Sequence, residues 1–132
     1  MSTHIHSAGA ARVEVVDEWH RDWPRVLAFI DEAGKRSDLQ LTPAGWVSAR
    51  QAVLAAFDGD QVVSHLAFHI EPLVDAIESG GSQPTLQAKL DTCAVARGRD
   101  EQAICRSLRS AAIEWARRIH CDTRAVEPAR VA

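Results

Sequence analysis

Residues 86–119 read LQAKLDTCAVARGRDEQAICRSLRSAAIEWARRI. Apolar and polar residues alternate over 86–95, which is the two-residue period of a β-strand. After the loop 96–100 the period changes, and the apolar side chains that follow form one helical stripe made of Ile104, Leu108, Ala111, Ala112, Trp115 and Ile119. This change of period predicts a strand, a loop and a long amphipathic helix over 101–119 that packs Ile104, Leu108 and Trp115 on a sheet.

The segments before this stretch supply further strands and helices. ARVEVV at 11–16 is β-branched and alternating, which predicts a strand. The segment 21–36 places apolar residues at helical spacing and carries a glycine near its end, which predicts a helix. Thr42 before Pro43 is a cap followed by a first-turn proline, so a second short helix is expected over 41–51.

Two further predictions complete the pattern of strands. Asp58-Gly59-Asp60 separates two apolar runs within 52–74, which predicts an antiparallel hairpin. TRAVEP at 123–128 is expected to form one last short strand. The order of these elements predicts an α+β fold, in which helices cover a mostly antiparallel sheet.

Composition narrows the class of protein. The 132 residues suffice for one domain, expected over 11–132 behind a flexible tail at 1–10. No apolar run is long enough to cross a bilayer and the first residues lack a signal-peptide pattern, so a cytoplasmic protein without a membrane partner is expected. The three cysteines lack C-x-x-C spacing and are expected to be reduced core residues.

The charge is unevenly distributed along the chain. Residues 1–96 contain 7 Lys and Arg against 13 Asp and Glu, whereas 97–132 contain 8 Arg against 5 acidic residues. The basic second part suits an anionic ligand, and a solvated, Arg-rich helix face is the alternative interpretation. A nucleic-acid partner is not expected, because the whole chain has a net charge of -3 and few lysines or interleaved aromatic residues.

The stretch from about Val53 to Cys121 resembles the acyl-CoA-binding half of the GNAT N-acetyltransferase superfamily. In that family a hairpin of the type VLAAFDGDQVVSHLAF precedes a strand that ends in a valine, as LDTCAV does here. A pyrophosphate-binding loop and helix follow, and they are matched by ARGRDEQAICRSL and RSAAIEWARRIHC. The resemblance implies an acyl-CoA N-acyltransferase-like fold that is truncated after the long helix.

The resemblance also implies how acetyl-CoA and its acceptor would bind. The main chain around Cys93 and Val95 would contact pantetheine, and the pyrophosphate would lie at the N-terminus of the helix that begins near Glu101. The acceptor would be an amine on a small molecule or peptide. The cofactor-binding residues implied in this way are Cys93, Ala94, Val95, Arg97, Arg99, Gln102, Ala103, Ile104 and Cys105.

The loop departs from the family pattern at three positions. Asp100 stands where the family usually has Arg or Gln, and Ala103 and Cys105 stand at the Gly or Gly/Ala positions. A β-carbon there takes up space that the backbone needs to approach a pyrophosphate. In the alternative interpretation Asp100 and Glu101 are first-turn residues whose negative charges interact favourably with the helix dipole, whether or not a ligand binds.

A further departure concerns the end of the chain. A complete family member continues through more strands and often supplies a tyrosine as general acid, whereas this chain ends soon after Cys121 and has no tyrosine. Two function classes therefore remain open, an acetyl transferase and a non-catalytic binding or assembly module that has lost its cofactor site. A homodimer is expected in both, because a truncated sheet leaves an open edge.

Candidate catalytic residues lie on the second strand of the hairpin. Strand alternation places His65, His69 and Glu71 on one face, and acyl transfer to an amine needs a base to take the amine proton. The alternative is a partly exposed face whose polar residues meet water. His4 and His6 are too few to predict a metal site. The four tryptophans are expected to be core or interface anchors.

Overall fold

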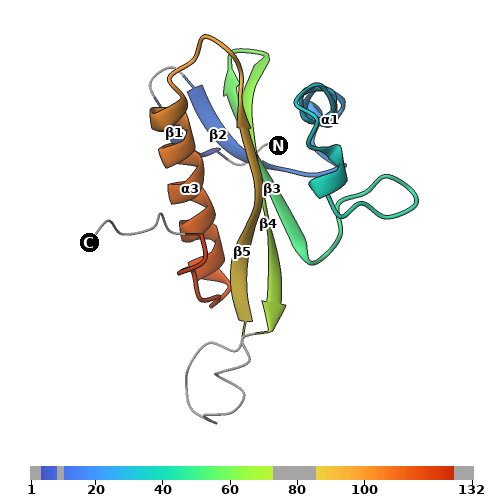
Figure 1. Cartoon of the computed structure of the whole chain (residues 1–132), viewed down its shortest axis with the longest axis vertical. Coiled ribbons are helices and arrows are strands. Elements are labelled where there is room, and N and C mark those ends of the chain that lie inside the picture. Colours follow the sequence, from blue (N-terminus) through green and yellow to red (C-terminus); the bar gives the residue numbers. More distant parts are fainter. Residues whose placement is uncertain (1–3, 9–10, 73–85, 127–132) are drawn as a thin grey trace.

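A five-stranded antiparallel sheet runs through the computed structural model, which describes residues 4–8, 11–72 and 86–126 (Figure 1). Each strand pairs with its neighbour in the sequence, so the order across the sheet equals the order along the chain. The chain is therefore α+β, as the pattern of elements predicts. The strands are β1 (His4–Ala8), β2 (Ala11–Val16), β3 (Gln51–Asp58), β4 (Gln61–Pro72) and β5 (Leu86–Val95).

Two helices cover opposite faces of this sheet (Figure 1). Helix α1 (Trp23–Glu32) follows β2, and its buried residues Val26 and Ile30 join one apolar cluster with Val53 and Phe57. A short 3-10 turn, η1 (Arg36–Asp38), comes after it. The two sheet surfaces are called below the α1 face and the α3 face.

Helix α3 (Glu101–Arg118) packs on the other face through the predicted stripe from Ile104 to Trp115, whereas Ile119, the last residue of the predicted stripe, is the C-cap and is 40% exposed. Leu108 is fully buried, Ile104 is almost fully buried, and the ring of Trp115 meets the ring of Phe68 edge-on at 5.6 Å between centroids. The prediction that Ile104, Leu108 and Trp115 pack on a sheet is confirmed. None of the described helices is long and apolar enough to cross a membrane.

The predicted hairpin is also confirmed, since β3 and β4 pair antiparallel from Gln51 and His69 to Asp58 and Gln61. Gly59 has φ +60 in the two-residue turn, a left-handed conformation that glycine adopts without a β-carbon penalty. The hairpin turn is thus encoded locally.

An extra residue in β5 changes the predicted facing of its side chains. Phe68 pairs with Leu90 and Ala67 pairs with Thr92, so Asp91 has no partner of its own and forms a β-bulge. The alternation therefore shifts by one position. Thr92 therefore lies on the α1 face and Cys93 on the α3 face. In a regular strand the two would be exchanged, because Thr92 would share the α3 face with Leu90.

Three predicted segments differ in the structure. Residues 41–51 form no second helix: Thr42 and Trp46 instead close a tight turn around Gly45, whose φ of +82 is incompatible with a continuing helix. Residues 123–126 form a turn in place of the predicted strand, and 127–128 lie outside the described residues. Within the segment 1–10, expected to be a tail, His4–Ala8 is the paired strand β1.

Candidate functional site

Three side chains linked by hydrogen bonds lie on the α1 face, where β4 and β5 run side by side. The imidazole of His69 lies between two carboxylates, with Nδ1 2.5 Å from Asp91 Oδ1 and Nε2 3.1 Å from Glu71 Oε2. His69 and Glu71 are two residues apart on β4, so strand alternation brings them to one face. Asp91 is on the same face because Lys89, two residues before it on β5, pairs directly with His69. We call these three residues the relay.

Neighbouring polar groups fix both carboxylates of the relay. Gln51 donates from Nε2 to Asp91 Oδ2 at 2.9 Å and to the main-chain oxygen of Asp38 at 3.1 Å. Lys89 Nζ and Gln87 Nε2 each lie 3.0 Å from Glu71 Oε1. Each carboxylate therefore has one oxygen for His69 and one for a supporting donor, which orients the imidazole.

The electrostatics of the relay favour a proton on the imidazole. Partial burial lowers the pKa of His69, but the hydrogen bonds to Glu71 and Asp91 outweigh it and raise that pKa above its ordinary value. Hydrogen bonds from His69 and Lys89 hold the pKa of Glu71 below its ordinary value. The relay is therefore a partly exposed imidazole whose basicity two carboxylates increase.

The third predicted catalytic residue, His65, lies on the same face but apart from the relay. It is fully buried beneath α1, with its ring edge-on to Phe29 at 6.0 Å between centroids. Neither ring nitrogen has a hydrogen-bond partner among the described residues. Burial, followed by the charge of Lys35, lowers the pKa of His65 to about 4. His65 is thus a neutral core residue at neutral pH.

Sequence reasoning missed Asp91 and Gln51 as members of the site. A regular strand places Asp91 beside Cys93, whereas the bulge separates their faces. The available signal was polarity: Gln87, Lys89 and Asp91 alternate along β5, where Gln87 pairs with Glu71 and Lys89 pairs with His69. Cross-strand pairs of that kind interact when they share a face.

In the predicted cofactor loop, the side chain of Asp100 already binds the backbone at the start of α3. Asp100 is the N-cap of α3, and its Oδ1 accepts a hydrogen bond from Ala103 N at 3.2 Å. The carboxylate thus uses one of the backbone donors that a pyrophosphate would need, and it stabilises the helix without a ligand. Glu101, in the first turn, also stabilises the helix without a ligand, because its negative charge interacts favourably with the positive end of the helix dipole.

The two arginines of the loop differ in their surroundings. Arg99 faces the β3–β4 hairpin, where its Nη1 lies 2.6 Å from Asp58 Oδ2 and its Nη2 lies 3.3 Å from Gln61 Oε1. Arg97 is exposed next to Gly98. Arg99 therefore fastens the loop to the sheet and is already neutralised by a carboxylate.

The remaining residues of the predicted cofactor set lie along β5 and the first turns of α3. Cys93 and Cys105 lie with their sulfur atoms 3.6 Å apart, and burial raises the pKa of the Cys93 thiol to about 12. Such a thiol is a poor nucleophile at neutral pH, which supports the predicted packing role. Ala94, Val95 and Ala103 are half-buried, Gln102 is exposed and Ile104 belongs to the core.

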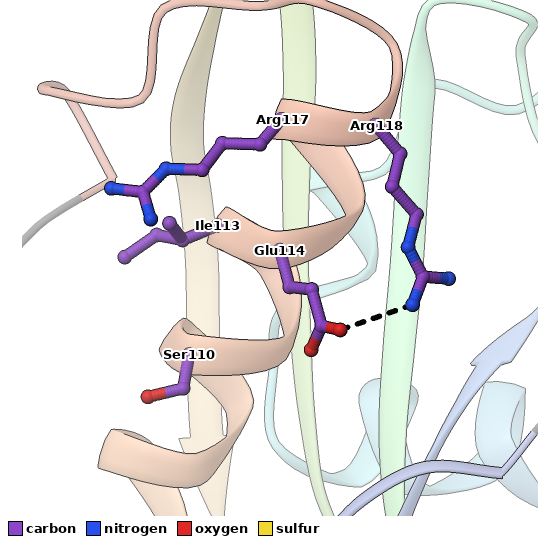
Figure 2. Close-up of a pocket in the computed structure, with 5 residues that line it drawn as sticks. All are labelled: Ser110, Ile113, Glu114, Arg117 and Arg118. Carbon is purple, nitrogen blue, oxygen red and sulfur yellow. Dashed lines mark hydrogen bonds and ion pairs between the residues drawn. The ribbon is translucent and has the colours of Figure 1, made fainter.

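A shallow hollow lies elsewhere, on the outer side of α3 (Figure 2). Figure 2 shows Ser110, Ile113 and Arg117 on one side of it and the ion pair of Glu114 with Arg118, 3.0 Å long, on the other. None of the predicted site residues lines this hollow. It is an open helix surface with charges of both signs, so the relay remains the stronger candidate site.

Comparison of the chain with protein-family models finds no match, and comparison with curated proteins finds none either.

Proposed function

We propose that the chain acts as an acyl-CoA-dependent N-acyltransferase-like protein, with the relay as the proton acceptor for an amine. The observation that carries the proposal is the imidazole of His69, held between Asp91 and Glu71 beside the bulge of β5. Two further features support it: the order of strands and helices resembles the GNAT pattern from β3 to α3, and the two helices cover opposite faces.

The proposed reaction uses the neutral form of His69. With Nδ1–H donated to Asp91, the amine takes the place of Glu71 Oε2 at Nε2, and Nε2 accepts the proton that the amine loses when its nitrogen attacks the thioester carbonyl. The carbon–sulfur bond then breaks, and the proton passes to the departing thiolate of coenzyme A. Because the carboxylates raise the pKa of His69, the rate is expected to rise with pH through that raised pKa.

Acetyl-CoA would bind along β5 and the start of α3. By the resemblance, the main chain from Cys93 to Val95 would pair with pantetheine, and the first turn of α3 would receive the pyrophosphate. Arg97 is the exposed cation of this loop. A homodimer that completes the sheet belongs to the same proposal, and because pantetheine would take the outer edge of β5, the second copy would cover the edge at β1.

A second candidate function is a non-catalytic binding or assembly module. The observation that favours it is the cap on α3, because Asp100 occupies the donor Ala103 N without any ligand. The β-carbons of Ala103 and Cys105 favour it too. The two candidates predict opposite outcomes in one binding measurement.

Calorimetry with acetyl-CoA tests the two candidates, and release of the free thiol in the presence of an amine panel tests turnover. In the enzyme, His69→Gln and Asp91→Asn are expected to lower turnover by roughly a hundredfold while acetyl-CoA still binds, since general-base catalysis contributes about that factor or more. Glu114→Gln, which removes a carboxylate on the outer side of α3, is the matched control. Variants that turn over at the wild-type rate would exclude the relay.

A loop variant separates a weakened cofactor site from an absent one. Asp100→Asn keeps an oxygen acceptor for Ala103 N but removes the negative charge, and Cys105→Gly removes a β-carbon. Together they are expected to tighten acetyl-CoA binding by roughly tenfold if the site exists, with thermal unfolding as the control for the glycine. A folded double variant that binds no acetyl-CoA would establish the module in place of the enzyme.

A further inference from the structure

Two tryptophan rings lie next to each other on the surface, on the α1 side of the sheet. Trp19 follows β2 and is 80% exposed, and Trp46 belongs to the turn before β3 and is 50% exposed. Their ring centroids are 6.2 Å apart and their planes are tilted by 43°. Indole rings carry a large apolar area and are mostly covered in folded proteins, so two adjacent exposed rings indicate a contact surface. Of the two roles expected for the tryptophans, core or interface anchor, the exposure of this pair leaves the interface role.

The folded chain holds both rings in place through their backbones. Trp19 N donates to Asp17 Oδ1 at 2.8 Å, and Trp46 N donates to Thr42 Oγ1 at 3.2 Å. Glu18 Oε2 accepts from Val47 N at 3.0 Å, which joins the two segments across 29 positions of sequence. The rings are therefore positioned before any ligand arrives, and this lowers the entropic cost of binding.

The charge next to the rings is negative. Asp17 and Glu18 precede Trp19 directly, and each carboxylate is anchored by the hydrogen bond just described. The nearest arginine in the sequence, Arg21, lies 3.7 Å from the carboxylate of Asp22 and is compensated by it. The face of an indole ring is itself a region of negative potential. Rings and carboxylates together favour a positively charged ligand.

We infer that Trp19 and Trp46 form an aromatic clamp for an organic cation of the alkylammonium class, with Asp17 and Glu18 as the flanking carboxylates. Cation–π attraction acts when a cation lies over the face of an indole ring within about 6 Å of its centroid, and both rings are exposed enough to offer a face to such a cation. The clamp is a binding site, and it stands independently of the proposed acyl transfer.

Titration of the full chain with choline, followed by tryptophan fluorescence, tests the clamp. The uncharged carbon analogue 3,3-dimethylbutanol has the same shape without the charge and serves as the matched ligand. Choline is expected to bind more tightly than the analogue, by roughly three- to thirtyfold, as cation–π energies imply. Trp19→Ala and Trp46→Ala are each expected to weaken choline binding to a similar extent, and so is the isosteric double change Asp17→Asn with Glu18→Gln.

Two controls keep the experiment decisive. Leu86→Ala truncates another exposed apolar residue, 40% exposed, and is expected to leave choline binding unchanged. Sedimentation of wild type and Trp19→Ala detects a second copy seated on the rings. Equal binding of choline and its analogue, undiminished binding by folded tryptophan variants, or a dimer that Trp19→Ala dissociates would each overturn the clamp.

Discussion

The two faces of the sheet differ in chemistry although a described helix lies on each of them. On the α3 face, an 18-residue helix lies over apolar side chains such as Leu54, Leu66 and Phe68, and the contact is closed. On the α1 face, a 10-residue helix covers only part of the sheet. The polar residues of β4 and β5, among them His69 and Asp91, occupy the part of this face away from α1's apolar contacts.

This difference shows how one sheet supports both stability and a site. A continuous apolar contact stabilises the fold and keeps even its thiols uncharged, whereas a shorter helix leaves charged strand residues that meet water and one another. His65 lies at the boundary between the buried and the polar parts of the α1 face. It is on the same side of β4 as His69, but it is buried beneath α1. Four predictions probe the contrast between the faces.

Truncation of the α3 face is expected to have the largest effect. Leu108→Ala removes a fully buried side chain at the centre of the α3 contact and is expected to lower the free energy of unfolding by about 3 kcal/mol. Urea denaturation measures the change. The control is Ile119→Ala, at a position that is 40% exposed, and its free energy of unfolding is expected to stay within about 0.5 kcal/mol of wild type. Equal effects at the two positions would contradict the closed packing.

Acid is expected to destabilise the α1 face through His65. Its pKa falls from 6.5 to about 4 on folding, so below pH 6.5 the unfolded chain binds a proton that the folded chain does not. The stability is full above pH 6.5 and falls by up to about 3 kcal/mol as the pH drops to 4.

The variant His65→Leu isolates that contribution. It is expected to flatten the acid loss and to gain about 1 kcal/mol at pH 7, because two unpartnered ring nitrogens leave the core. Chemical denaturation at pH 5 and pH 7.5 compares the two chains. A variant that keeps the full acid slope would place the responsible group elsewhere.

The helix cap is expected to have an intermediate effect. Asp100→Ala removes the acceptor for Ala103 N and is expected to cost about 1 kcal/mol, whereas Asp100→Asn keeps an oxygen there and costs less. Thermal unfolding of both variants measures the difference. If Asp100→Ala proves neutral, the carboxylate does not cap the helix in solution.

The smallest expected effect is the contribution of His69 to the free energy of unfolding, which changes with pH in the opposite direction to that of His65. His69 has a raised pKa in the folded chain, so its stabilisation is complete below pH 6.5 and is lost as the pH rises through the folded pKa. His69→Gln is expected to remove a contribution of about 0.5 kcal/mol, small because the pair is partly exposed. NMR titration of the His69 ring protons checks the direction, and a midpoint below 6.5 would contradict it.

Elements with a complete local signal could be predicted from the sequence. Asp58-Gly59 specifies the hairpin turn, and the stripe from Ile104 to Trp115 specifies α3 and its buried side. Thr42 and Pro43 gave a helix signal that Gly45 overrode, because a left-handed glycine two residues later ends a helix before its first turn closes.

The composition of the site was beyond the reach of sequence periodicity. His69 and Glu71 share a face by simple alternation, and the structure brings them into contact. Asp91 meets them because it alternates with Lys89, the direct partner of His69, so the site depends on the register of β4 against β5, and no local residue pattern in LQAKLDTCAV sets that register. Burial separated His65 from the other two, since helix coverage depends on where α1 ends over the sheet.

The strictly sequential order of the strands has a consequence for how the chain folds. Every strand forms its ladder with the strand made just before it, so each one finds its partner already synthesised, and no strand must thread between two others. Pairing of strands that are close in the sequence lowers the entropic cost of closing a loop, most of all for the β3–β4 hairpin with its two-residue turn. The helix that covers the larger apolar contact is the last regular element among the described residues, so this surface stays exposed to chaperones and to aggregation until α3 has left the ribosome.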